Sequence, residues 1–327
     1  DETLVFKKRF CYDKKGKRAV LYADTLDPCG EIFVNGKLVK TVADYSAVYA
    51  DVTDYVENGD NELEIKVYPR APEVLYPWHR HKDPYNGWFC GEVYIESLSD
   101  CYLKSVKSVT NSALDNNIKQ SFDITILSDT SCEKTLLIEV EGVKSICTPV
   151  TLTRGKNRVT VKAELALNSW SPNSPALYNV KFSLIGANGK PCDEYYLKTG
   201  FRTIEQKHGA MLLNGKDFIM KGALLMQFLP PYENVPVNHV CPTNEEIVFQ
   251  TLAAKKMGCN TIRMHQLGYG SGDARFARVF DALGLTVIWI TRAIDSVNEI
   301  IFSGKWKQKS RYLRQIEKVI NSPSVIM

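Results

Sequence analysis

Apolar and polar residues alternate along most of the first two hundred positions, which is the pattern of strands with one buried face. Residues 31–42, EIFVNGKLVKTV, place Asn35-Gly36 between two such runs, and this dipeptide predicts a hairpin closed by a type I′ turn. A second turn at residues 58–61 opens another alternating run, and EVYIESL ends near residue 98. We therefore expect a first β-sandwich, interrupted by a long loop rich in Pro, Gly and aromatic residues.

A second group of strand-like segments follows, separated by turn residues. These segments are SFDITILSD, KTLLIEVEG, NRVTVKAELAL and LYNVKFSLIGANGKPCDEYYLK. Short strands at this spacing are typical of an immunoglobulin-like sandwich. Strand structure is thus predicted to continue to about residue 205.

The period of the pattern changes after residue 205. DFIMKGALL predicts a strand, and Thr243 with Glu246 forms a capping box for a helix that ends at Gly258. NTIRMH predicts a second strand, and the apolar residues of ARFARVFDAL then recur with a helical period before Gly284.

A third strand, LTVIWIT, is followed by a helix with Leu313, Ile316 and Ile320 on one face, and SVIM would begin a fourth strand. Strands of nearly continuous apolarity that alternate with helices predict a parallel α/β sheet. The pattern alone leaves a barrel and a doubly wound sheet as alternatives.

Composition excludes several classes of function. The chain has 327 residues, 44% hydrophobic and 24% charged, with a net charge of +4 that is dispersed along it. No basic block with interleaved aromatics suggests nucleic acid, and no apolar run approaches the roughly 20 residues of a membrane helix. Nine cysteines occur without a CxxC pair, so neither a disulfide scaffold nor a zinc module is indicated.

Six segments in chain order resemble landmarks of glycoside hydrolase family 2, the group of β-galactosidase, β-glucuronidase and β-mannosidase type enzymes. They are DVTDYVENGDNELEIKV, NGWFCGEVYIE, NSWSPNSPALYNV, TGFRTIE, LLNGKDFIMKGALL and DALGLTVIW. The resemblance covers essentially the whole chain. It implies a multidomain β then α/β protein: a jelly-roll β-sandwich at 1–99, an immunoglobulin-like β-sandwich at 100–205, and at 206–327 the first half of a TIM (β/α)8 barrel, truncated at strand 4.

The resemblance also implies a retaining exo-β-glycosidase, β-galactosidase-like, that hydrolyses terminal sugars of oligosaccharides or glycoconjugates. In the family, a segment like NSPSVIM enters barrel strand four, with a His usual where Ser322 stands. The acid/base Glu and the nucleophile Glu come later, so both are expected beyond Met327 and this chain alone is expected to be inactive. The alternative is a non-catalytic carbohydrate-binding or scaffold protein.

Three residues are candidates for substrate binding. Arg263 ends the second strand, and barrel active sites gather at the carboxyl ends of strands. The resemblance implies that Arg263 supports the nucleophile, the alternative being a pair with a structural carboxylate. His265 stands one position before the sugar-contacting His of the family, and a backbone-bonded loop His is the alternative. Asp295 follows the third strand and either binds sugar hydroxyls or caps a turn.

Other positions near the strand ends depart from the family pattern or offer further sugar contacts. Residues 224–227, LLMQ, replace the Asn-x-His or Asn-His-Glu group of galactosidases and glucuronidases, which indicates a different or more apolar subsite. For Leu224 and Leu225 the favoured alternative is core packing at the strand end. Trp289 is interpreted as core rather than as a stacking platform. The long loop of the first sandwich either offers sugar-binding side chains or packs on the sandwich edge or against the barrel; these side chains are Trp78, His79, His81, Asp83, Tyr85 and Trp88.

No cofactor or metal site is indicated, and the expected partner is a carbohydrate substrate, with no nucleic acid, no membrane and homo-oligomerisation left open. The sequence does not fix the compartment, although a periplasmic or secreted location is slightly favoured over a cytoplasmic one.

Overall fold

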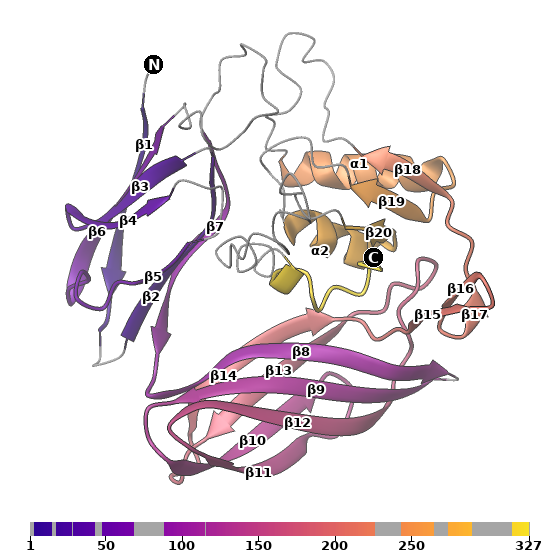
Figure 1. Cartoon of the computed structure of the whole chain (residues 1–327), viewed down its shortest axis with the longest axis horizontal. Coiled ribbons are helices and arrows are strands. Elements are labelled where there is room, and N and C mark those ends of the chain that lie inside the picture. The colour runs from indigo at the N-terminus through magenta and orange to yellow at the C-terminus, as the bar shows by residue number, and fades with distance from the viewer. Residues whose placement is uncertain are drawn as a thin grey trace, which may run out of the picture.

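The computed structural model describes residues 3–14, 18–27, 29–42, 48–68, 88–114, 116–225, 243–264, 274–289 and 316–326. Within them the chain is mostly β-structure. Two β-sandwiches come first, and a smaller unit of parallel strands and helices follows. Figure 1 shows the first sandwich and the α/β unit on opposite sides of the view, with the second sandwich below both.

The first sandwich pairs two sheets of order β1-β6-β3-β4 and β5-β2-β7. Its strands are β1 (Leu4–Tyr12), β2 (Arg18–Asp27), β3 (Cys29–Val34), β4 (Lys37–Val42), β5 (Val48–Asp51), β6 (Gly59–Tyr68) and β7 (Trp88–Leu98). The predicted hairpin is confirmed, because Asn35 (φ 51°) and Gly36 (φ 74°) join β3 to β4 with the positive φ angles of a type I′ turn. Alternate residues of β6 are buried in the core between the sheets, as the pattern predicted.

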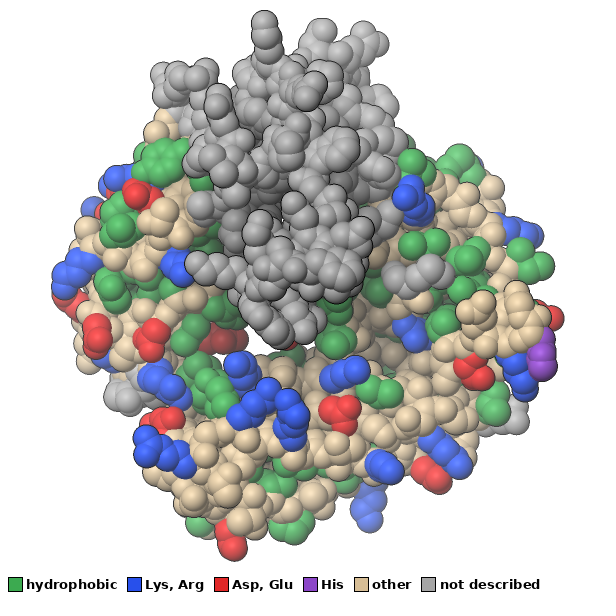
Figure 2. Space-filling model, in the orientation of Figure 1, with side chains coloured by type: hydrophobic (Ala, Val, Ile, Leu, Met, Phe, Trp, Pro, Cys, Tyr) green, Lys and Arg blue, Asp and Glu red, His purple; other side chains and the backbone are tan. Residues whose placement is uncertain are grey.

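The second sandwich pairs sheets of order β12-β9-β8 and β11-β10-β13-β14. Its strands are β8 (Cys101–Leu114), β9 (Asn117–Ser128), β10 (Cys132–Val140), β11 (Ile146–Leu152), β12 (Gly155–Ala166), β13 (Tyr178–Ile185) and β14 (Pro191–Thr199). The core between the sheets contains Phe122 and Phe182, whose rings lie edge to face with their centres 5.3 Å apart. Lys and Arg lie among Asp and Glu over both sandwiches in the view of Figure 2, consistent with a dispersed charge.

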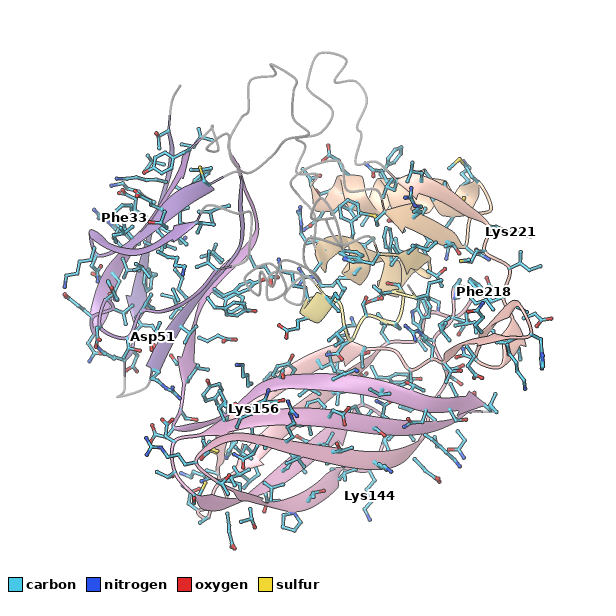
Figure 3. The ribbon with its side chains drawn as sticks, viewed as in Figure 1. Phe33, Asp51, Lys144, Lys156, Phe218 and Lys221 are labelled. Atoms are coloured by element: carbon cyan, nitrogen blue, oxygen red, sulfur yellow. The ribbon has the colours of Figure 1, made fainter. Side chains whose placement is uncertain are left out.

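A short antiparallel sheet links this sandwich to the α/β unit. Its strands are β15 (Ile204–Lys207), β16 (Ala210–Leu213) and β17 (Lys216–Asp217). The strand predicted over DFIMKGALL is shorter than expected: Asp217 pairs with Leu212, and only β18 (Gly222–Leu225) joins the next sheet. Between them lie Phe218 and Lys221, labelled in Figure 3, and Asn260 holds this linker by accepting from the amide of Lys221 at 2.8 Å.

The α/β unit contains β18, α1 (Asn244–Lys256), β19 (Thr261–Met264), α2 (Ala274–Leu283) and β20 (Thr286–Ile288), and its three strands are parallel in that order. The predicted capping box is present, with the Thr243 side chain accepting from the amide of Glu246 and the carboxylate of Glu246 accepting from Thr243. A fourth strand begins at Val325, which forms a parallel bridge with Val287. Leu313, from the helical face predicted before it, lies outside the described residues; Val319 is buried while Ile320 is exposed, so Ile320 does not belong to a buried face.

Candidate functional site

The parallel strands carry different side chains on their two faces. Residues of the helix-facing side, including Ile262 and Val287, are buried in one core with α1 and α2. The other face carries the row Leu224, Arg263 and Ile288, which the ladder places in register on three adjacent strands. Leu224 is 47% exposed and Arg263 is exposed, so this face is open in the described part of the chain.

Arg263 is therefore a cation on the open face of a parallel sheet, one residue from the carboxyl end of β19. Within the described residues Arg263 forms no ion pair, so none of the carboxylates described there is the structural partner that the alternative requires. Trp289 follows β20 and packs in the helix-facing core, 8% exposed, in agreement with its interpretation as core. Its buried Nε1–H has no acceptor in the described ranges.

The other candidates cannot be placed beside Arg263. His265 and Asp295 lie outside the described residues, as do Gln227 and the long loop of the first sandwich up to residue 87. Of the three substrate-binding candidates, only Arg263 has a described position, and the roles of all three stay predictions.

The structure shows a junction that sequence reasoning did not single out, between the second sandwich and the α/β unit. Trp170, fully buried, donates from Nε1 to the backbone carbonyl of Asp281 at 2.8 Å. The ammonium of Lys255, at the end of α1, donates to the carbonyls of Leu283 and Gly284 at the end of α2 and of Pro172 in the sandwich. A cation at the carbonyls that end a helix is favourable both as a donor and for the helix dipole.

Asp281 organises the segment that leads into the fourth strand. Its carboxylate accepts from the Ser322 hydroxyl at 2.5 Å and from the Ser324 amide at 2.9 Å. Burial raises the pKa of this carboxyl above its usual value, while the bonds from Ser322 and Ser324 and the nearby charge of Arg202 oppose the rise. Ser322, which stands where the family usually has a His, is thus a structural donor here.

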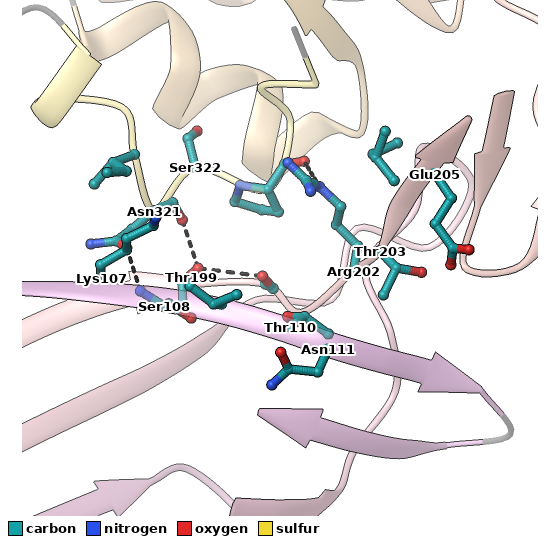
Figure 4. Close-up of a pocket in the computed structure, with 15 residues that line it drawn as sticks. Lys107, Ser108, Thr110, Asn111, Thr199, Arg202, Thr203, Glu205, Asn321 and Ser322 are labelled. Atoms are coloured by element: carbon teal, nitrogen blue, oxygen red, sulfur yellow. Dashed lines mark hydrogen bonds between the residues drawn. The ribbon is translucent and has the colours of Figure 1, made fainter. Parts of the chain in front are cut away.

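Arg202 and Asn321 fasten the same segment to the sandwich, as Figure 4 shows. The guanidinium of Arg202 donates to the carbonyls of Pro323 and Val325. Asn321 accepts from the amide of Ser108 at 2.8 Å and donates to the carbonyl of Val106 at 2.7 Å. Burial lowers the pKa of Arg202, and the carboxylate of Asp281 opposes that change.

We call this set the strand-four clamp: Trp170, Arg202, Asp281, Asn321, Ser322 and Ser324. A cavity of about 340 Å³ lies beside it, with polar groups from β8, from the chain after β14 and from residues 320–323. The segment that the clamp holds continues directly into the fourth strand, where the Ile326 amide donates to the carbonyl of Val287 in β20 at 3.0 Å. The clamp therefore fixes where the fourth strand starts relative to β20.

The described residues contain no group of three or more His, Cys, Asp or Glu side chains placed to hold a metal ion. Within the same ranges, none of the helices has the length and apolarity needed to cross a membrane.

Comparisons with known proteins bear on both sandwiches. Residues 1–104 match the profile of the glycosyl hydrolase 2 galactose-binding domain-like family, and residues 102–202 match that of glycosyl hydrolases family 2. A β-galactosidase of Thermoanaerobacter pseudethanolicus is 27% identical over 69% of this chain and 32% of its own length. A putative β-glucuronidase of Formosa agariphila is 23% identical over 82% of this chain and 32% of its own length.

The fold also matches a solved structure. A glycosyl hydrolase family 2 member from Bacteroides cellulosilyticus superposes with a TM-score of 0.79 at 22% identity, over 99% of this chain and 42% of that one. The chain therefore spans about a third of the curated relatives named above and under half of this structure.

Proposed function

We propose that this chain, which belongs to glycosyl hydrolase family 2, forms the N-terminal part of a retaining exo-β-glycosidase. Two profiles of that family together match residues 1–202 of the chain. Its substrates are terminal sugars of oligosaccharides or glycoconjugates, of the β-galactoside type. The names of the two curated relatives, a β-galactosidase and a putative β-glucuronidase, support this substrate class.

The proposed architecture is a jelly-roll sandwich at 1–99, an immunoglobulin-like sandwich at 100–205 and the first strands of a (β/α)8 barrel from 206. Three parallel strands that alternate with two helices, with a fourth strand beginning beside β20, support the barrel. The open face with Leu224, Arg263 and Ile288 then becomes the interior of that barrel.

The strand-four clamp is the observation that carries the proposal. In a retaining glycosidase, two carboxyl groups stand about 5–5.5 Å apart, one as acid/base and one as nucleophile. The sequence resemblance puts the acid/base at the carboxyl end of strand four, beyond Met327. A carboxylate must be held within about half an ångström of its productive position, and the clamp fixes the start of the strand that would carry it.

Arg263 supplies the positive charge in this scheme. From strand β19, its guanidinium would donate to the nucleophile and hold it ionised and oriented. In this proposal the 327 residues provide the sandwiches, this arginine and the clamp, and both carboxylates would come from sequence after Met327, so these residues alone are expected not to hydrolyse a glycoside.

The test begins with the coding sequence after the codon for Met327. A Trp and an Asn-Glu pair within about ten residues, followed by further strand and helix units, are expected from the family resemblance. The extended protein should hydrolyse p-nitrophenyl β-D-galactoside with retention of configuration, whereas the 327-residue chain should not. Turnover by the short chain, or a stop codon together with glycan binding by it, would overturn the proposal in favour of a different enzyme or of a carbohydrate-binding protein.

A further inference from the structure

Three cysteine side chains lie near one another in the second sandwich. Cys101 begins β8 in one sheet, Cys132 begins β10 in the other, and Cys192 lies in β14. Cys101 is buried in the core, and the other two pack against that core while keeping part of their surface exposed. They come from strands far apart in the sequence, so the fold brings them together.

The turn between β9 and β10 holds the first two close. Cys101 lies directly opposite Ser128 in the antiparallel ladder, and the Ser128 hydroxyl is 3.7 Å from Sγ of Cys132. The Asp129 amide donates to the carbonyl of Asp100 at 2.8 Å, which ties the turn to the start of β8. The Ser128 hydroxyl and the Cys132 thiol are both close enough to the Cys101 thiol to affect its pKa.

We propose that Cys101 and Cys132 form a reversible thiol–disulfide site that cross-links the two sheets of the second sandwich. Cys192 is not a member of the pair, because its thiol donates to the carbonyl of Leu184 in its own sheet at 3.1 Å. The remaining exposed thiols of the described residues, Cys11 and Cys147, lie on β1 and β11.

The oxidant is a low-molecular-weight disulfide, and the chemistry is thiol–disulfide exchange. Cys132, the more accessible thiol, attacks the small disulfide as its thiolate, forms a mixed disulfide and releases one small thiol. Cys101 then attacks the Cys132 sulfur, displaces the second small thiol and completes the protein disulfide. Two protein thiols are oxidised and one small disulfide is reduced to two thiols, so atoms and electrons balance.

The order of these steps follows from the environment of Cys101. Burial raises the pKa of its thiol to about 11, with the neighbouring cysteines adding to the rise and the Ser128 hydroxyl opposing it. A thiol that stays protonated near neutral pH is a poor first nucleophile, so Cys101 acts as the resolving thiol once Cys132 is already bonded to the reagent.

The cross-link would also secure a contact with the first sandwich. Asp129, in the turn next to Cys132, pairs with Arg18 of β2 at 3.5 Å. The guanidinium of Arg18 also lies 5.3 Å from the ring centre of Tyr102, the neighbour of Cys101. Oxidation would therefore fix the turn and the strand end to which the first sandwich is attached.

The experiment treats the reduced 327-residue chain with excess cystamine, removes the reagent and digests the protein without reduction. We expect mixed disulfides at exposed thiols such as Cys11 and Cys147, together with a linked pair of peptides containing Cys101 and Cys132, which separates on reduction. Cys132→Ser should abolish the linked pair, and Cys132→Ala repeats the test with a smaller apolar side chain. The matched control Cys147→Ser, an exposed cysteine on β11, should leave it unchanged.

Three outcomes would overturn the proposal. They are a linked pair that includes Cys192 in place of either partner, a Cys132 that keeps the cystamine half without closing on Cys101, and free thiols retained at both Cys101 and Cys132. None of them bears on hydrolysis, so the site stands or falls independently of the proposed function.

Discussion

Trp170 of the second sandwich donates its indole N–H to the backbone carbonyl of Asp281, although 111 residues separate them in the sequence. This carbonyl belongs to the last turn of α2, where helix carbonyls lack partners within the helix. The side chain of the same Asp281 holds the segment that enters the fourth strand. One residue therefore connects the sandwich, the second helix and the start of the next strand.

Trp170→Phe should destabilise the junction by about 2 kcal/mol, because the Asp281 carbonyl loses a buried donor and part of the indole volume is left empty. Chemical unfolding followed by intrinsic fluorescence measures the change. Tyr196→Phe, which removes an exposed hydroxyl bonded to Glu194 at 2.9 Å, is the control and should change stability by less than about 0.5 kcal/mol. Equal effects of the two substitutions would mean that the indole bond contributes nothing specific.

Gly284→Ala should be much more destabilising than Gly258→Ala. Both glycines follow helices with positive φ, 75° and 86°, so both alanines are conformationally strained by about 1 kcal/mol. A Cβ at Gly284 would also lie 2.3 Å from the carbonyl oxygen of Pro172, whereas one at Gly258 meets nothing within 4 Å. The difference between the two variants in urea unfolding therefore isolates the close approach of α2 to the sandwich. A difference below about 1 kcal/mol would show that the junction relaxes.

Local features of the fold were predictable because neighbouring residues determine them. The Asn35-Gly36 hairpin and the Thr243 capping box depend on backbone conformations that those residue types favour. In the second sandwich, two strands were missed for physical reasons. In β8 the register shifts twice, between Leu103 and Ser105 and between Thr110 and Ser112, so the alternation of burial is lost. Strand β11 lies at a sheet edge and contains Pro149, which a central strand would not tolerate.

The strand-four clamp could not be read from periodicity, because each of its bonds joins segments that no local pattern relates. Arg202, Trp170 and Asp281 lie in three of the segments that carry the family resemblance, TGFRTIE, NSWSPNSPALYNV and DALGLTVIW. The resemblance therefore marked the residues, but only the structure shows that they meet. For the substrate-binding candidates the structure adds the position of Arg263 alone.

Asp281→Asn should alter how stability depends on pH. Burial raises the pKa of this carboxyl above the ordinary 3.8. At pH values between 3.8 and the raised pKa, the folded state therefore binds more protons than the unfolded state. Stability contributed by this group is then present at low pH and is lost as pH rises through the folded pKa. Asparagine does not titrate, so the stability of the wild type relative to the variant should fall as pH rises from about 4 and then level off.

Urea unfolding across that pH range measures the effect. The diagnostic quantity is the slope of the stability difference between wild type and variant against pH, rather than the size of that difference. The variant also removes the carboxylate near Arg202. Because that arginine stays charged at every pH used, this removal lowers the stability of the variant by the same amount across the pH range. Asp123→Asn, at an exposed aspartate on β9, is the matched control. A relative stability that rises with pH would contradict the raised pKa.

Arg202→Met should loosen the beginning of the fourth strand while leaving both sandwiches folded. Methionine keeps the apolar stem, but the carbonyls of Pro323 and Val325 lose their donors. The amides of Val287 and Ile326, which bond across to residues 324 and 287, should then exchange with deuterium at least tenfold faster. Arg154→Met, at an exposed arginine of the second sandwich, should leave these rates unchanged. If Arg202→Met leaves exchange at both amides unaltered, Asn321 and Asp281 suffice to hold the segment. The position of the strand proposed to carry the acid/base would then not depend on the arginine.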